Sequence, residues 1–167
     1  MAKPIVSVVM GSDSDLKTME HAFGVLRHFG IPHEVRILSA HRTPKEAIVF
    51  AKRSARRGLR VIIAGAGGAA HLGGVIAANT TLPVIGVPMG TGVLKGMDAL
   101  LSIVQMPKGI PVAAVTIGNS GAVNAALLAV EILSLSSSAL GKKLVRYRAS
   151  MKRKVLAKDR FYRREKR

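Results

Sequence analysis

Five short apolar runs recur along the chain, and each is followed by a loop of small or polar residues and then by a helical pattern. They occupy residues 5–10 (IVSVVM), 33–38 (HEVRIL), 60–64 (RVIIA), 82–87 (LPVIGV) and 111–117 (PVAAVTI). Strands that alternate with helices predict a parallel sheet with right-handed crossovers and helices on both faces. We therefore expect a three-layer α/β fold with a five-stranded parallel sheet, in which the half-polar second strand lies near an edge.

Capping signals place the helices between these strands. Ser12 and Asp13 are good N-caps for a helix that ends at Gly30. Thr43, followed by Pro44 and Glu46, predicts a capping box at the start of a helix over residues 44–57. Further helices are expected at 69–79, 97–104 and 118–136, and a last, basic helix at 139–158. This pattern predicts one domain at 1–138, followed by a basic C-terminal helix and tail at 139–167.

The net charge of +17 is concentrated at the C-terminal end. Residues 142–167 contain 13 Lys and Arg against two acids, whereas residues 1–141 contain 13 against seven. Such a run is usually a solvated face, and contact with RNA or another polyanion is the second interpretation. There is no cysteine, and the apolar runs are too short or too interrupted for a signal peptide or a membrane span. We expect a soluble, cytoplasmic protein.

Three of the loops that follow strands carry residues suited to a ligand. In open α/β sheets, ligands bind at the carboxyl ends of the strands. The first loop is GSDSD (residues 11–15), and the second is SAHRTP (residues 39–44). Hydroxyls and a guanidinium suit phosphate, and a carboxylate suits ribose hydroxyls. The candidates for binding a phosphorylated sugar are Ser12, Ser14, Asp15, Ser39 and Arg42.

The third loop lies within AGAGGAAHLGG (residues 64–74), where glycine and alanine dominate and His71 and Leu72 are the only large side chains. Two explanations stay open: tight packing of a helix on a strand, or a floor of free backbone N–H groups under a ligand. His41 and His71 are the only histidines in the candidate loops, and a histidine there can transfer protons near neutral pH.

Other chemistry has no counterpart in the sequence. The glycines follow the third strand and not the first, which argues against a nicotinamide or flavin site. No carboxylates and histidines have metal-ligand spacing, and no serine, histidine and acid form a triad. We therefore expect a reaction without a metal or a covalent nucleophile. The sources of catalysis that remain are positioning of the substrate, exclusion of water from the pocket and proton transfer.

Four blocks, GSDSD, SAHRTP, GAGGAAHL and SIVQMPKGIPV, together resemble the class I N5-carboxyaminoimidazole ribonucleotide mutases of purine (IMP) biosynthesis. The resemblance runs from about Ile5 to Leu133. It implies a flavodoxin-like fold and a homo-octamer with active sites at subunit interfaces. It also implies a reaction without metal or cofactor, which moves a carboxylate from the exocyclic nitrogen of an aminoimidazole ribonucleotide to ring carbon C4.

The resemblance also implies roles for particular residues. His41 would be the general acid and base, and His71 would hold the migrating carboxyl group together with the backbone amides around it. Ser12, Asp15 and Arg42 would bind the ribonucleotide, with Ser14 and Ser39 nearby. The remaining implied substrate contacts are Gly65, Gly67, Gly68, Ala69, Ala70 and Leu72.

Two departures and two alternatives accompany this resemblance. Gly73 stands where many members have proline, and the basic tail lies outside the four blocks. A related subclass carboxylates aminoimidazole ribonucleotide directly with CO2 and typically has lysine and glycine at the positions of Arg42 and Thr43, so SAHRTP favours the mutase. The alternative from another class is a non-catalytic nucleotide- or RNA-binding module that uses the tail.

Overall fold

A computed structural model describes residues 2–165, and its centre is a five-stranded sheet in the order β2-β1-β3-β4-β5. All four strand pairings are parallel. The predicted sheet is therefore confirmed, with β2 at an edge as expected. The strands are β1 (Val6–Met10), β2 (His33–Ile37), β3 (Val61–Ala66), β4 (Val84–Pro88) and β5 (Ala113–Ala114).

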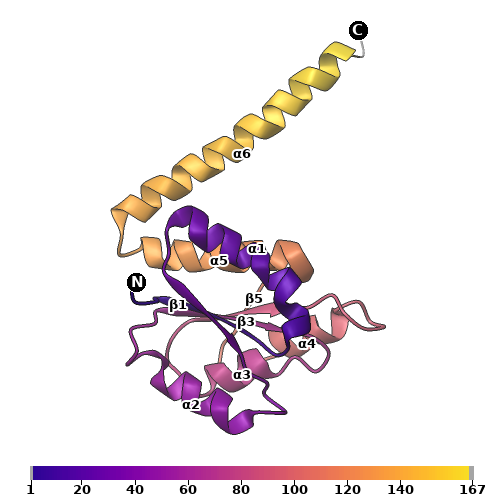
Figure 1. Ribbon diagram of the computed structural model, residues 1–167. Helices are drawn as coiled ribbons and strands as arrows, with labels where there is room; N and C mark the ends of the chain where they lie inside the picture. The colour runs from indigo at the N-terminus through magenta and orange to yellow at the C-terminus, as the bar shows by residue number, and fades with distance from the viewer. Residues whose placement is uncertain (1, 166–167) are drawn as a thin grey trace.

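Helices cover both faces of this sheet (Figure 1). On one face lie α1 (Leu16–Phe29), which follows a short 3-10 turn at Asp13–Asp15, and α5 (Gly118–Ser134). The other face carries α2 (Pro44–Ser54), α3 (Leu72–Ala77) and α4 (Met97–Val104). Because side chains alternate along a strand, Val8 packs under α1 and α5 while its neighbour Val9 packs under α2. Two apolar cores result, one on each face.

Several boundaries differ from the predicted ones. The fifth strand is two residues long and not seven, and its first predicted residue, Pro111, has no N–H to donate to the ladder with β4. In contrast, β3 runs two residues past Ala64, where β1 and β4 pair with it on both sides. Three helices are shorter than expected: α2 ends at Ser54, α3 spans only Leu72–Ala77, and α5 ends at Ser134, whereas the last helix continues to Glu165 and not 158.

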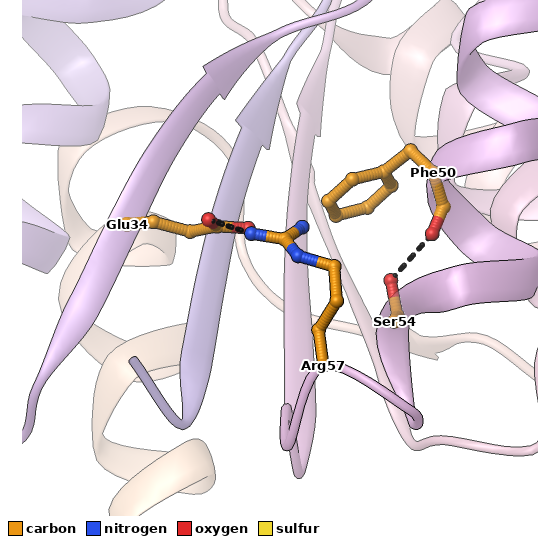
Figure 2. Close-up of polar contacts among 4 residues, drawn as sticks. All are labelled: Glu34, Phe50, Ser54 and Arg57. Carbon is orange, nitrogen blue, oxygen red and sulfur yellow. Dashed lines mark hydrogen bonds and ion pairs between the residues drawn. The ribbon is translucent and has the colours of Figure 1, made fainter. Parts of the chain in front are cut away.

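An ion pair connects the edge strand β2 to the residues that follow α2, and the arginine of this pair also contacts the Phe50 ring on α2 (Figure 2). Glu34 on β2 pairs with Arg57, which follows α2. The Arg57 Cζ lies 5.9 Å from the centroid of the Phe50 ring, and Ser54 Oγ donates a 2.8 Å hydrogen bond to the Phe50 carbonyl. These contacts join the two elements that flank residues 38–43, the second candidate loop.

The last helix, α6 (Ser138–Glu165), begins on the body of the protein and then projects away from it (Figure 1). Near its start, Leu144 is buried in the core with α1 and α5, and Lys143 Nζ donates a 2.9 Å hydrogen bond to the Phe29 carbonyl. Arg148 forms an ion pair with Glu131 on α5. Every residue from 151 to 163 is exposed. Within the described chain, no helix is both long enough and apolar enough to cross a membrane.

Candidate active site

A cavity of about 370 Å³ lies at the carboxyl ends of the strands, where the loops after β1, β2, β3 and β4 meet. This confirms that loops far apart in the sequence gather at one edge of the sheet. The loop after β5 does not contribute. The cavity is lined by Gly11, Ser12, Ser14, Asp15, Ser39, Ala40, His41, Arg42, Ala66, Gly67, Ala69, His71, Leu72 and Thr91.

Three of the predicted site residues, Gly65, Gly68 and Ala70, do not line this cavity. Gly65 lies inside β3, paired with β1 and β4, and a Cβ added there would come within 2.7 Å of Met19 Sδ. Close packing therefore explains this glycine. Ala70 is buried in the core under α2 and α3, and Gly68 turns the chain with a φ of 59°. The other predicted residues surround the cavity, and their roles toward a ligand remain predictions.

The first loop buries one carboxylate. Ser12 Oγ accepts a 3.3 Å hydrogen bond from the Ser14 amide, and the Asp15 amide donates a 3.3 Å hydrogen bond to the Ser12 carbonyl. These bonds form the 3-10 turn that points Asp15, only 7% exposed, toward the cavity. Burial raises the pKa of Asp15 above its ordinary value of 3.8, although hydrogen bonds from Ser12 and Ser14 and the charge of Arg42 oppose the shift.

The second loop is held by two hydroxyl groups. Ser39 Oγ accepts hydrogen bonds from the amides of His41 (3.3 Å) and Arg42 (3.1 Å). Thr43 Oγ1 accepts from the Ser39 amide at 2.9 Å and donates to the Ser39 carbonyl at 3.1 Å. Thr43 is the N-cap residue of α2, as predicted, but the predicted capping box is wrong. Its hydroxyl closes the loop onto Ser39 and does not cap the helix.

Arg42 connects the second loop to the first. Its Nη2 donates a 2.8 Å hydrogen bond to the Gly11 carbonyl, and the Gly11 amide in turn donates to the Gly65 carbonyl at 3.2 Å. The guanidinium therefore lies over the turn that carries Ser12 and Asp15. Since guanidinium groups bind phosphate through several N–H donors, this arrangement leaves donors of Arg42 beside the serine hydroxyls for an anionic ligand.

The two histidines contact each other across the cavity. His41 Nε2 lies 2.9 Å from His71 Nδ1, and the rings are perpendicular with centroids 5.0 Å apart. A hydrogen bond between two imidazole nitrogens requires that one donates and the other accepts, so the tautomers of the two rings are linked. Sequence reasoning placed both histidines in site loops but did not predict this hydrogen bond.

Four lining residues were not predicted: Gly11, Ala40, Ala66 and Thr91. Thr91 follows β4, and its Oγ1 lies 2.7 Å from the position that a Cβ on Gly67 would take. One signal in the sequence could have indicated Thr91: the loop of small residues at 88–92 follows a predicted strand. In the part of the chain that the structure describes, no three histidines or acids form a group that could hold a metal ion.

A polar cavity at the carboxyl ends of a parallel sheet, with two histidines, an arginine and a buried carboxylate, defines a small-molecule-binding α/β protein. The model of one family of such proteins, AIR carboxylase, matches residues 5–154. The chain belongs to this family.

Similar proteins agree with this assignment. A protein from Pyrococcus horikoshii named N5-carboxyaminoimidazole ribonucleotide mutase is 58% identical over 153 residues, which cover 92% of this chain and 85% of that protein. A Bacillus subtilis protein of the same name is 54% identical, and the alignment covers 92% of this chain and 95% of that protein. The crystal structure of Treponema denticola PurE aligns with a TM-score of 0.84 and 31% identity, covering 93% of this chain and 96% of that one.

Proposed function

We propose that this protein converts N5-carboxyaminoimidazole ribonucleotide to 4-carboxy-5-aminoimidazole ribonucleotide in purine biosynthesis. The observation that carries the proposal is the cavity in which His41 and His71 meet beside Arg42 and Asp15. The names of relatives that are 54–58% identical over most of the chain support the same activity. The enzyme is an isomerase that needs no metal or cofactor.

The nucleotide is held by the first two loops. Arg42 and the hydroxyls of Ser12 and Ser14 bind the phosphate, and Asp15 accepts hydrogen bonds from the ribose hydroxyls. Ser39 acts indirectly, because its hydroxyl holds the amides of His41 and Arg42 in place. This arrangement directs the aminoimidazole ring toward the third loop.

The carboxylate migrates beside Gly67, Ala69 and Leu72, which offer backbone and apolar surface but no charge. Removing water from a carboxylate on nitrogen destabilises it and favours cleavage of the N–C bond to release CO2. The N–C bonding electrons return to the nitrogen, which takes up a proton. The ring carbon C4 then attacks the retained CO2 and loses its own proton, so one proton enters and one leaves.

His41 transfers both protons in this scheme. It protonates the exocyclic nitrogen as CO2 leaves and later removes the proton from C4, whereas His71 and the nearby amides hold the carboxyl group. The hydrogen bond between His41 Nε2 and His71 Nδ1 adds a constraint to this scheme. When the substrate binds, that bond has to exchange for a bond to the ligand, whereas before binding the tautomer of each histidine constrains that of the other.

The second candidate function is direct carboxylation of aminoimidazole ribonucleotide with CO2, the activity that the family description names. Arg42 and Thr43 favour the mutase, because Thr43 closes the loop through both its hydrogen bonds to Ser39. A glycine at this position, typical of the direct carboxylases, has no hydroxyl to make them.

Supplying each nucleotide separately tests the two activities. The mutase converts the N-carboxylated nucleotide rapidly at CO2 concentrations too low to carboxylate free aminoimidazole ribonucleotide. If turnover occurs only with the decarboxylated nucleotide and added CO2, the protein is the carboxylase. If the protein binds the nucleotide but turns over neither compound, it is a non-catalytic binding module.

The assembly we propose is a cytoplasmic homo-octamer with its sites at subunit interfaces. An exposed apolar stripe supports an interface beside the cavity: Leu94, Met97, Leu101 and Val104 are each 50–60% exposed and recur at helical spacing along α4 and the residues before it. The loop between β4 and α4, which carries Leu94, also carries Thr91, and Thr91 lines the cavity. A partner that covers this stripe would therefore lie against the site. Residues 1–138 form the catalytic domain, and residues 139–167 form its basic extension.

A further inference from the structure

The hydroxyl of Thr43 closes a loop and does not cap the helix that follows it. Thr43 is the N-cap residue of α2, where a threonine ordinarily accepts a hydrogen bond from an amide of the first helical turn. Here Oγ1 accepts instead from the Ser39 amide at 2.9 Å and donates to the Ser39 carbonyl at 3.1 Å. The Thr43 amide donates to the same carbonyl at 3.0 Å. Three hydrogen bonds therefore join the two ends of residues 39–43.

This closed loop carries His41 between its two ends. Ser39 Oγ accepts hydrogen bonds from the amides of His41 and Arg42, so the backbone of the histidine is bound to the residue that Thr43 holds. Thr43 itself is not among the residues that line the cavity with the two histidines. Its effect on a ligand in that cavity is therefore indirect, through the position of the loop.

The chain on both sides of the loop is fixed. Before it, Leu38 is buried, and its amide donates a 2.9 Å hydrogen bond to the Met10 carbonyl. After it, Ala47 and Phe50 anchor α2 in the core on this face of the sheet. Movement of this part of the chain is therefore confined to residues 39–43, whose conformation depends on their own hydrogen bonds.

Two further contacts hold the loop, but both use groups that the substrate engages. Arg42 Nη2 donates to the Gly11 carbonyl, and His41 Nε2 contacts His71 Nδ1. In the proposed reaction, Arg42 binds the phosphate and His41 contacts the reacting ring, so these two contacts exchange for contacts to the ligand. The hydrogen bonds of the Thr43 hydroxyl do not depend on the ligand. They are the ones that keep the loop closed while the reaction proceeds.

A loop that opens during the reaction allows CO2 to leave. In the scheme above, CO2 is released beside the third loop, and ring carbon C4 has to attack it before it diffuses away. Because CO2 carries no charge, closure of the cavity retains it more effectively than any ionic contact. If CO2 escapes after His41 has protonated the nitrogen, C4 keeps its own proton and His41 regains a proton from water. The products of that branch are aminoimidazole ribonucleotide and CO2.

We propose that the Thr43 hydroxyl is a positioning group that keeps the second loop closed and thereby determines the fraction of CO2 that is recaptured. This inference rests on the proposed mutase function. It concerns the retention of CO2 and not the proton transfers themselves. Without the hydroxyl, the N–C bond still breaks, but less of the released CO2 reaches C4.

The test follows the carboxyl carbon of N5-carboxyaminoimidazole ribonucleotide, isotopically labelled at that carbon, in buffer that contains unlabelled CO2. Recapture keeps the label in the 4-carboxy product. Escape gives aminoimidazole ribonucleotide, or an unlabelled product after dissolved CO2 has entered. Loss of the substrate without protein is subtracted. Three variants are compared with the wild type: Thr43→Val, which keeps the shape of threonine without the hydroxyl, Thr43→Ala, and Thr43→Ser, which keeps the hydroxyl.

A matched control makes the same change in another turn. Thr80 Oγ1 accepts a 3.3 Å hydrogen bond from the Leu82 amide, in the turn before β4 and thus at the opposite edge of the sheet from the cavity. Thr80 and Thr43 are both half-buried. Thr80→Val therefore removes a comparable hydroxyl without reaching the site.

We expect Thr43→Val and Thr43→Ala to raise the escaped fraction of the label by about tenfold, because each intramolecular hydrogen bond changes an equilibrium by roughly fivefold. Thr43→Ser and Thr80→Val should stay within about twofold of the wild type. Hydrogen exchange of the amides at residues 39–43 should be faster in Thr43→Val and Thr43→Ala alone. Circular dichroism of each variant shows that the domain is folded.

Three results would overturn the inference while the mutase function stands: an escaped fraction in Thr43→Val equal to that of the wild type, an equal increase in Thr43→Ser, or an equal increase in Thr80→Val. Slower turnover of Thr43→Val with unchanged escape would also overturn it, because the hydroxyl would then serve only to orient His41. If the wild type itself leaves no label in the 4-carboxy product, the mutase function fails, and the inference fails with it.

Discussion

Replacing Gly67 with alanine places a methyl group between two loops of the site. Gly67 follows β3 and lines the cavity, and a Cβ built on it would lie 2.7 Å from Thr91 Oγ1 and 3.2 Å from Met89 Cβ. Both distances are shorter than an ordinary contact of about 3.5–4.0 Å. Neither atom is the end of a long side chain, so relief requires movement of the loop after β4.

Overpacking of this kind costs about 1–3 kcal/mol of folding free energy. For a chain of this size, each kcal/mol lowers Tm by about 2–4 °C. Gly67→Ala should therefore lower Tm by roughly 3–10 °C. The change should also lower turnover, because the loops after β3 and β4 separate and the cavity between them changes shape.

Thermal unfolding, monitored by circular dichroism, measures the change in Tm, and two other variants serve as matched comparisons. Gly24 is exposed in α1 and has no atom within 4 Å of an added Cβ, so Gly24→Ala should stabilise the protein by about 0.5–1 kcal/mol. Thr91→Ala removes the Oγ1 that the new methyl group would meet. The double variant of Gly67 and Thr91 should therefore be more stable than the sum of the single changes predicts, by about 1 kcal/mol or more.

A Gly67→Ala protein as stable as the wild type, or a loss that Thr91→Ala does not relieve, would refute this account of the contact. The same double variant decides between the two explanations of the glycine. If Gly67 serves only packing, turnover recovers together with stability. If Gly67 keeps space for the migrating carboxylate, stability recovers but turnover stays low.

Three further predictions concern the site and the interface. His41→Asn should reduce turnover by about 10²–10⁴-fold with little change in Tm. The control His21→Asn changes an exposed histidine in α1 and should have no effect on turnover. Near-normal turnover of His41→Asn would exclude His41 as the acid and base. Because burial raises the pKa of Asp15, the folded protein holds that proton more tightly than the unfolded chain, so ionised Asp15 costs stability above its folded pKa. Asp15→Asn should thus raise Tm at neutral pH and weaken nucleotide binding. Below the unfolded pKa near 3.8, where Asp15 is protonated in both states, the variant should be no more stable than the wild type. An unchanged Tm at neutral pH would contradict the burial argument. In sedimentation, Leu101→Glu should dissociate the oligomer, whereas Leu135→Glu, at a position 89% exposed, should not; an intact Leu101→Glu oligomer would place the interface elsewhere.

The three layers and the edge position of the second strand followed from local patterns, but element lengths did not. Predicting β2 at an edge required only its half-polar sequence, and the C-cap at Gly30 required only the glycine itself. The length of β5 depends on how much of β4 pairs with it, here Ile85 and Gly86, and the run PVAAVTI does not contain that information. Ladder length is a property of paired strands, so one strand's sequence does not determine it: β5 is shorter than its apolar run, and β3 extends past its own.

The site shows the same distinction between local and non-local information. The loops after β1, β2 and β3 could be predicted because serine, aspartate, histidine and arginine after a strand are local signals. The hydrogen bond from Arg42 to the Gly11 carbonyl and the contact between His41 and His71 join residues about 30 positions apart. A backbone carbonyl has no sequence signal, and the approach of two histidines depends on the crossing of two loops.

In residues 64–74, the role of each glycine depends on whether it lies inside β3 or after the end of that strand. Gly65 pairs with Met10 on one side and Val87 on the other, so its missing side chain makes room for Met19 and Met89 in the core. Two residues later the pairing has ended, and Gly67 lines the cavity. Packing is thus the explanation for Gly65, whereas Gly67 lies where a ligand could reach it, and the boundary between the two lies at Ala66, where β3 ends. The pairing of β3 with β4 reaches furthest, to Ala66 and Pro88, so lengthening that pairing by one residue would bring Gly67 into the sheet.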